Sequence, residues 1–442
     1  MLMDTGTTAA GRVAAATPAG RDRFADLLRV VSIVVVVAGH WLMAVVVWRD
    51  GRVEGGNALA LVPGLWLATW LLQVMPLFFF VGGLANLVSA RRGGWAEFVR
   101  GRATRLLRPT VAFLAVWAVG ATALGLAGVP EAVLRPVARL VVQPLWFLGL
   151  YLLVVALAPA MLRLHRRFGP AVVVWLGLAA AVADLVSRAA GPAGWLPALD
   201  RVGDGNFVLV WLFAQQLGFL YADGILTSWP RRAHAAMAAG GLTTLVALTA
   251  SGAWPPSMVG LPGDRVSNMN PPSLCIVALT VWLVGLAMLL RPAVTRWLER
   301  PRPWTMVVTA GSALMTLFLW HLTALALAVL LLHPLGLTEP TPGTLAWWAL
   351  RPLWLLVPAA MLVPLVALFA RFERSRPTLW PRPRSVAVAL GLIAVVVGIL
   401  GVAVSGIWPL SGSGVRLLAL GVGTLLLGAV GSRRDRTAVA AA

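Results

Sequence analysis

Twelve long apolar runs constrain the fold of this chain more than any other feature of its sequence. They lie near residues 27–48, 65–89, 106–128, 140–162, 171–190, 206–222, 234–253, 273–290, 305–332, 346–369, 386–408 and 415–431. Runs of about 17–25 apolar residues are long enough to cross a bilayer as helices. With 60% hydrophobic and only 12% charged residues among 442, the composition argues against a soluble domain. The predicted fold class is an all-α, polytopic transmembrane helix bundle of about 12 helices.

Arginines give an independent test of this topology. The chain has no lysine, and most arginines fall in every second connection, on the side that holds the start of the first helix and the connections near 91–108, 163–167, 231–232, 291–302 and 371–384. Such an excess of positive charge marks the cytoplasmic side. We therefore expect cytoplasmic termini and a multi-pass protein of the plasma membrane. The net charge of +20 is then explained by topology, so the expected partners include membrane lipids and no nucleic acid.

The apolar runs divide the chain into four parts. Residues 1–21 are rich in Ala, Thr and Gly and are expected to form a disordered cytoplasmic tail. Residues 22–375 hold about ten helices, residues 376–431 hold two more, and residues 432–442 form a second tail. The single Cys275 excludes an intramolecular disulfide and a multi-cysteine metal site. No spacing predicts a zinc site, a P-loop or a dinucleotide fingerprint, so no metal is expected.

The first apolar run carries two ionisable side chains on one face of the predicted helix. Arg29 opens the run and His40 lies near its middle. Their eleven-residue spacing corresponds to three turns plus about 20°, or about 16 Å along the axis. An ionisable side chain deep in an apolar helix usually faces a cavity or a partner rather than lipid. His40 is either a structural histidine bonded to a backbone carbonyl or a functional imidazole near mid-membrane, with Arg29 at the cytoplasmic boundary.

Three arginines recur at the predicted cytoplasmic start of the third helix. Arg102, Arg105 and Arg108 follow at intervals of three residues in R-A-T-R-L-L-R-P. On one side of a helix, three guanidinium groups can form a multi-donor clamp for phosphate or pyrophosphate. The alternative is that these arginines set the topology and touch anionic lipid headgroups.

A second histidine lies inside a late apolar run. His321, in F-L-W-H-L-T-A-L, is expected at a depth similar to that of His40. Two histidines that converge on one cavity would suit a catalytic site. The alternative is a structural histidine satisfied by Thr316, Thr323 or a neighbouring carbonyl.

Asp184 is the only carboxylate well inside an apolar run. It could orient an imidazole, as the acid of a catalytic triad does. A local pair with Arg188, one turn later on the same helix, is the alternative that the spacing favours.

Polar and aromatic residues around the fourth helix are candidates for an acceptor pocket. They are Gln143, Trp146 and Tyr151. The alternative places Gln143 at the membrane interface and counts the tryptophan as part of the aromatic belt.

Taken together, these stretches resemble the acyltransferase-3 family of integral membrane acyltransferases. The resemblance rests on D-L-L-R with His40 eleven residues after Arg29, on F-F-F-V-G-G at 78–83, on R-A-T-R-L-L-R-P, on L-W-F-L-G-L-Y at 145–151 and on L-W-H-L-T at 319–323. It covers roughly residues 20–375 in the right order. One departure is Gly82, where the family more often has serine.

The resemblance implies an enzyme that transfers an acyl group other than an aminoacyl group. The donor would be a cytoplasmic thioester such as acetyl-CoA, which is a co-substrate rather than a bound cofactor. The acceptor would be a hydroxyl of a carbohydrate, glycolipid or small metabolite, as in O-acetylation. His40 would act as general base or be acylated transiently. Arg29, Arg102 and Arg105 would hold the CoA phosphates.

Two other functions compete with this interpretation. A proton-coupled transporter or flippase would use His40 and His321 for proton coupling, but it would be expected to carry several intramembrane carboxylates and matching halves. A structural or regulatory membrane protein that has lost activity is the third possibility. Retention of Arg29 with His40, and of Arg102 with Arg105, argues against it.

Overall fold

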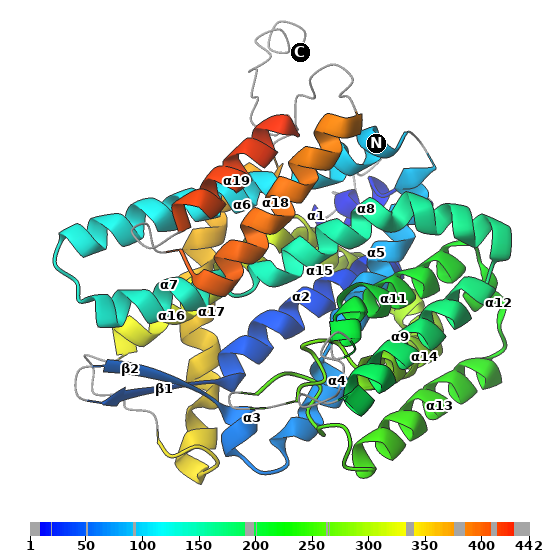
Figure 1. The fold of residues 1–442 in the computed structure, drawn as a ribbon, viewed down its shortest axis with the longest axis horizontal. Coiled ribbons are helices and arrows are strands. Elements are labelled where there is room, and N and C mark those ends of the chain that lie inside the picture. Colours follow the sequence, from blue (N-terminus) through cyan, green and yellow to red (C-terminus); the bar gives the residue numbers. More distant parts are fainter. Residues whose placement is uncertain are drawn as a thin grey trace, which may run out of the picture.

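The structure, a computed structural model, is a bundle of helices arranged in layers (Figure 1). It describes residues 9–18, 20–49, 52–91, 94–190, 199, 201–261, 264, 266–332, 340–374, 385–407 and 413–427. Within these residues, 11 helical stretches are long and apolar enough to cross a membrane, and Gly414–Leu426 is a shorter apolar helix. The predicted all-α, polytopic bundle is therefore confirmed.

The helices follow the predicted apolar runs closely. In the first half of the chain they are α1 (Ala9–Ala15), α2 (Arg23–Met43), α3 (Ala58–Leu61), η1 (Leu65–Ala68), α4 (Thr69–Leu72), α5 (Met75–Ala90), α6 (Trp95–Leu126), α7 (Glu131–Val142), α8 (Leu145–Phe168) and α9 (Ala171–Ala190). The second half holds η2 (Arg201–Gly205), α11 (Asn206–Ala222), α12 (Ile225–Ser228), α13 (Arg231–Ala250), α14 (Leu274–Leu298), α15 (Pro301–Gly311), α16 (Leu314–Leu332), α17 (Leu345–Arg374), α18 (Ser385–Ser405) and α19 (Ser413–Leu426).

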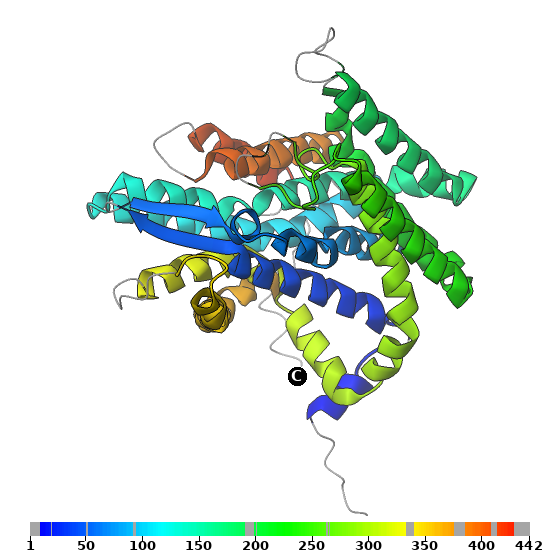
Figure 2. The same cartoon turned by 90° about the horizontal axis from the view of Figure 1, so that it is seen from below.

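Helices α2 and α5 lie between two outer layers. Figure 2 shows α18 and α19 beyond α6 and α8 on one side, and α15, α16 and α17 on the other. Helix α2 contacts α5, α14, α15, α16 and α17. A residue on the inward face of α2 is therefore enclosed by segments from the whole length of the chain.

Helix α11 is the most completely buried of these elements, because it is apolar around its whole circumference. It approaches α5 closely at two glycines. A Cβ atom at Gly83 would clash with the backbone of Gln215, and one at Gly218 would clash with the backbone of Phe80. Small residues at such crossings let two membrane helices pack backbone to backbone.

The first helix is shorter than predicted, and a β-hairpin follows it. The run expected to be helical to residue 48 ends its helix at Met43, and β1 (Ala44–Arg49) pairs antiparallel with β2 (Arg52–Asn57). Consecutive valines favour a strand over a helix. The Asp–Gly pair at sequence positions 50 and 51, which lie outside the described residues, is the hairpin signal that we overlooked.

Three further predictions about element boundaries need correction. The run at 305–332 is two helices, α15 and α16, that break after Gly311. The third helix begins at Trp95 rather than near residue 106. Residues 9–15, expected inside a disordered tail, form α1, which packs against α15. The tail predicted at 432–442 and part of the large 188–206 connection lie outside the described residues.

Candidate active site

The two intramembrane histidines meet in the interior of the bundle. Nδ1 of His40, near the end of α2, lies 3.0 Å from Nε2 of His321 on α16. The two rings stack, with centroids 5.1 Å apart and an angle of 28° between their planes. His321 is fully buried, whereas His40 keeps partial exposure. Of the pair, His40 is therefore the one with surface that the described residues leave uncovered.

The hydrogen bonds determine the tautomer of both rings when they are neutral. Nδ1 of His321 lies 2.6 Å from the backbone oxygen of Phe318. A carbonyl oxygen only accepts, so this nitrogen carries the proton and Nε2 of His321 is an acceptor. His40 then donates from Nδ1 toward His321, and its ring also interacts with the backbone of Val36 one turn earlier. Among the described residues no hydrogen bond is formed by Nε2 of His40, and an uncommitted lone pair there is what a base or a nucleophile requires.

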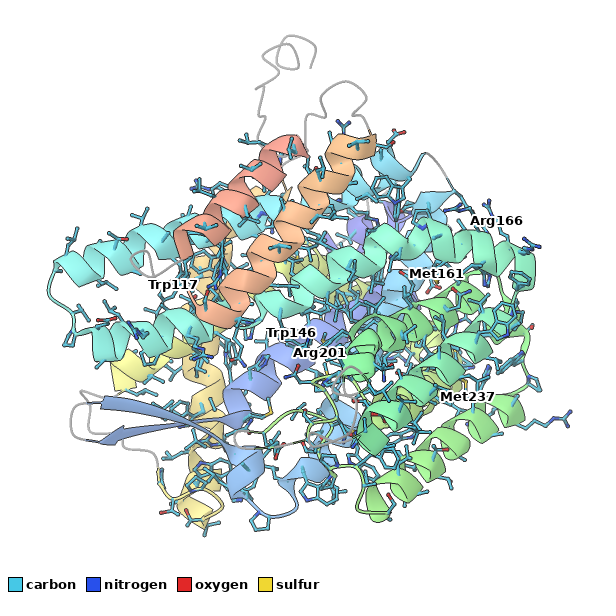
Figure 3. All side chains as sticks on the ribbon, viewed as in Figure 1. Trp117, Trp146, Met161, Arg166, Arg201 and Met237 are labelled. Carbon is cyan, nitrogen blue, oxygen red and sulfur yellow. The ribbon has the colours of Figure 1, made fainter. Side chains whose placement is uncertain are left out.

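Contacts on both sides hold the His321 segment in place. The indole nitrogen of Trp41, the residue after His40, donates to the backbone oxygen of His321 over 2.9 Å. Trp117 of α6, which is labelled in Figure 3, donates to the hydroxyl of Thr323 over 3.0 Å. The hydroxyls expected to satisfy His321, those of Thr316 and Thr323, therefore have other partners. A carbonyl and the second histidine satisfy the ring instead.

Glu373 caps the helix that carries His321. Its carboxylate accepts from the backbone nitrogens of Met315 and Thr316, over 3.1 and 2.9 Å, and from the hydroxyl of Thr316 over 2.8 Å. The break between α15 and α16 leaves these nitrogens without partners in a helix. A carboxylate at this point also complements the helix dipole. Glu373 thus fixes the start of α16, two turns before His321.

Arg351 occupies the opposite end of α2, next to His40. Its guanidinium lies 4.1 Å from the ring centroid of Trp347 and 5.2 Å from that of Trp354. Nη1 is 3.5 Å from the backbone oxygens of both Leu42 and Ala44. A cation at the C-terminal carbonyls of a helix is favourable, so this buried arginine stabilises the turn that carries His40.

The predicted arginines are only partly brought together. Arg29 lies on the same helix as His40, as expected, and pairs with Asp26 over 3.3 Å. The charges of Arg105 and Arg29 both act on Arg102. Arg105 is exposed and Arg108 half-buried. Steps of three residues turn the helix back by about 60° each, so the three arginines of α6 spread over its surface instead of forming one flat clamp.

Arg102 lies deeper than predicted, because α6 begins at Trp95. The indole of Trp95 donates to the backbone oxygen of Ala156 over 3.0 Å, and Arg102 lies two turns further along the helix. One guanidinium nitrogen, Nη2, donates to the backbone oxygen of Ala85 over 2.6 Å and to the hydroxyl of Ser89 over 2.8 Å. The other guanidinium nitrogens form no hydrogen bond with the described residues and are available to an anion.

A series of aromatic contacts runs from Tyr151 of α8 to His321 of α16. Tyr151 contacts Phe147, with ring centroids 5.9 Å apart. Phe147 contacts Phe318 at 5.4 Å, and Phe318 contacts His321 at 6.0 Å. Trp146, which is labelled in Figure 3, also contacts Phe147, with ring centroids 6.3 Å apart.

The three residues proposed for an acceptor pocket do not all lie together in the structure. Gln143 lies exposed in the turn before α8. Tyr151 lies within electrostatic range of Arg102. Tyr151 thus faces the arginine cluster, at a distance from the exposed turn that holds Gln143.

Asp184 has the contacts of a structural residue. One carboxylate oxygen accepts from Arg188 over 2.9 Å. The other accepts from the indole of Trp254 over 2.8 Å and from the backbone nitrogen of Leu274, at the start of α14, over 3.0 Å. The local pair that the spacing favoured is present. None of these bonds involves an imidazole, so the geometry gives no support to Asp184 as a catalytic acid.

Two residues of this site, Glu373 and Arg351, are not among the candidates that the sequence singled out. Glu373 lies among the arginines of the 371–384 connection, and Arg351 lies near the start of the apolar run at 346–369. A single carboxylate among five arginines, and an arginine flanked by tryptophans at i−4 and i+3, were the signals available. Among the described residues, no three His, Cys, Asp or Glu side chains converge as a metal site requires.

Comparison with known proteins assigns the family. The family model described as an acyltransferase domain matches residues 22–370. This range is more than half of the chain and contains His40, His321, Arg29, Arg102, Arg105, Arg108 and Arg351. No curated protein and no solved structure was found to be similar. This match, together with the apolar helices that it contains, shows that the chain is a multi-pass membrane acyltransferase and belongs to the acyltransferase-3 family.

Proposed function

We propose that this protein moves an acyl group, acetyl in the simplest case, from cytoplasmic acyl-CoA to a hydroxyl of a carbohydrate, glycolipid or small metabolite in the plasma membrane. One observation carries the proposal. His40 is a partly exposed residue, its Nδ1 is bonded to His321, and its Nε2 has no hydrogen-bond partner among the described residues. Within a family of acyltransferases, such a nitrogen is suited to take the proton of an attacking hydroxyl.

The proposed reaction conserves protons overall. Nε2 of His40 takes the proton of the acceptor hydroxyl while the oxygen attacks the thioester carbonyl. The tetrahedral intermediate then expels the thiolate, and the carbonyl–sulfur bond breaks. The proton returns from His40 to the thiolate, so the products are the ester and free CoA. The positive charge on His40 between these steps is stabilised by its bonds to Nε2 of His321 and the carbonyl of Val36.

His321 acts on His40 rather than on the substrate. Because its own Nδ1 donates to Phe318, it presents a lone pair to His40 and keeps the His40 proton on Nδ1. A donor in that position would instead favour the wrong tautomer, in which Nε2 of His40 is blocked. Loss of the correct tautomer at a catalytic histidine costs several orders of magnitude in rate. An acyl-histidine pathway would use the same free nitrogen.

Cationic groups on the predicted cytoplasmic side suit the anionic half of CoA. The charges of Arg29 and Arg105 both lie within electrostatic range of Arg102. Asp26 is the carboxylate bonded to Arg29, and no carboxylate is bonded to Arg102 or Arg105 within the described residues. Phosphate oxygens would supply the missing negative charge. Arg29 and His40 lie about 16 Å apart along their helix, a gap that an extended pantetheine arm spans.

The proposal is tested by transfer of label from radiolabelled acetyl-CoA to a total cell-envelope extract. Membranes with the wild-type protein are compared with His40→Ala, and His234→Ala serves as the matched control. His234 is a buried histidine of α13 that bonds the backbone oxygen of Leu226 over 2.8 Å. We expect label in acceptor with wild type and His234→Ala and none with His40→Ala. Equal transfer by all three would reject the mechanism.

A further inference from the structure

Tyr151 is a buried tyrosine whose hydroxyl the protein itself does not use. The side chain is 9% exposed, and its hydroxyl forms no hydrogen bond with the described residues. Buried tyrosines usually find a partner for this group. The second tyrosine of the chain, Tyr221, follows this rule: it donates to Asp22 over 2.6 Å and accepts from Arg291 over 3.0 Å. The hydroxyl of Tyr151 has no partner among the described residues, yet it is not one of their fully buried unpartnered atoms, so it keeps surface that a ligand can contact.

The ring of Tyr151 is held firmly in place. It contacts Phe78, Phe79 and Phe147 at centroid distances of 5.5, 5.9 and 5.9 Å. On its open side lies Gly82, where a Cβ atom would come within 3.2 Å of Cε2 and 3.5 Å of the hydroxyl. Contacts below about 3.4 Å are tighter than ordinary carbon packing. Glycine at position 82 thus makes room for the tyrosine ring and its hydroxyl.

Tyr151 lies between the two ends of the proposed reaction path. At one end, it is within electrostatic range of Arg102. At the other, Phe147 and Phe318 connect it to His321. If the phosphates of the donor bind near Arg102 and its thioester lies near His40, the arm that joins these two groups must run past Tyr151.

The chemistry of that arm matches the surroundings of Tyr151. The arm of CoA alternates methylene groups with two amides. Methylenes are compatible with the rings of Phe78, Phe147 and Phe318, but a buried amide without a partner is costly. A phenolic hydroxyl can donate to an amide oxygen or accept from an amide nitrogen.

We propose that the hydroxyl of Tyr151 binds an amide of the pantetheine arm, in a position that Gly82 keeps open. This inference rests on the proposed function, since it requires acyl-CoA as donor. It makes Tyr151 a donor-binding residue, in contrast to the acceptor-pocket role expected from the sequence.

The test distinguishes binding of the pantetheine arm from binding of the nucleotide. The affinities of the full-length protein in lipid nanodiscs are measured for CoA and for adenosine bisphosphate, the phosphate-bearing half of CoA without the arm. Tyr151→Phe, which keeps the ring and removes the hydroxyl, is expected to weaken CoA binding about three- to tenfold, the effect of one hydrogen bond. Its affinity for the nucleotide is expected to equal that of wild type. Gly82→Ala should show the same pattern through displacement of the ring.

Arg105→Ala is the contrasting variant, because it should weaken binding of both probes. Unchanged CoA affinity in Tyr151→Phe, or an equal loss for both probes, would overturn the proposal and leave the proposed function standing. A wild-type protein that binds neither probe would overturn the proposed function, and this inference with it.

Discussion

Nδ1 of His40 and Nε2 of His321 lie 3.0 Å apart, although 281 residues separate the two histidines in the chain. The contact joins α2, which also carries Arg29, to α16, whose start is fixed by Glu373 of α17. Each member of the pair constrains the other. His321 is fixed by a carbonyl at its far nitrogen, and it fixes in turn the proton on His40. The nitrogen that we propose as the reactive one, Nε2 of His40, is therefore positioned by residues that no substrate needs to touch.

Substitution of His321 should show whether it acts as an acceptor for His40. In His321→Gln the side-chain oxygen can still accept from Nδ1 of His40, whereas His321→Leu offers no acceptor. We expect a fall in kcat of about tenfold for glutamine and about a hundredfold or more for leucine, within the range of acid–base contributions. The affinity for CoA should be unchanged in both. Equal rates in the two variants would show that the acceptor is unimportant.

Substitution of Arg102 and substitution of Arg105 should have different effects on the melting temperature. Arg105 is exposed and makes no hydrogen bond with the described residues, so Arg105→Ala should weaken CoA binding about five- to tenfold and leave the melting temperature unchanged. Arg102→Ala should weaken binding and also lower the melting temperature, since it removes the bonds to Ala85 and Ser89. Binding and thermal unfolding are measured on the same detergent-solubilised samples. Identical behaviour of the two variants would contradict this division.

Loss of Glu373 should act on His321 through the helix that it caps. Glu373→Ala removes acceptors from two backbone nitrogens and one hydroxyl. We expect a loss of about 1–3 kcal/mol in the free energy of unfolding. A lower kcat at unchanged CoA affinity should accompany it. A variant as stable and as active as wild type would show that Glu373 does not position His321.

Asp184 should matter for stability alone. Asp184→Asn weakens the bonds to Arg188, Trp254 and the nitrogen of Leu274, and we expect a loss of about 1–3 kcal/mol. The activity of each folded molecule should equal that of wild type. Activity is normalised to folded protein by size-exclusion chromatography with fluorescence detection. Normalised activity that falls more than tenfold would restore a catalytic role for this carboxylate.

Most of the fold follows from properties that the sequence displays locally. Apolar length and arginine placement located the spanning helices, because the bilayer imposes both. The misplaced boundaries have local causes that hydropathy does not register. Valine-rich residues 44–47 are as apolar as a helix, yet they form β1. Gly311 lies between two apolar stretches that read as one run but form α15 and α16.

The site was predictable only where its residues share one helix. The spacing of Arg29 and His40 follows from helix geometry, so it could be derived before the structure. The meeting of His40 with His321, and of Tyr151 with Gly82, depends on how α2, α16, α8 and α5 pack. That information is not local to any segment. Arg102 was expected at the start of its helix for a simpler reason: α6 begins at Trp95, about three turns before the apolar run that starts near residue 106.

The central claim is that the free nitrogen of His40 performs the proton transfer or acyl capture. The most direct measurement is the single-turnover rate of acetyl transfer by His40→Gln in nanodiscs, with saturating acetyl-CoA and a cell-envelope acceptor fraction. We predict a rate at least about a hundredfold below that of wild type, with CoA affinity unchanged. A His40→Gln protein that transfers acetyl groups at the wild-type rate would contradict the account.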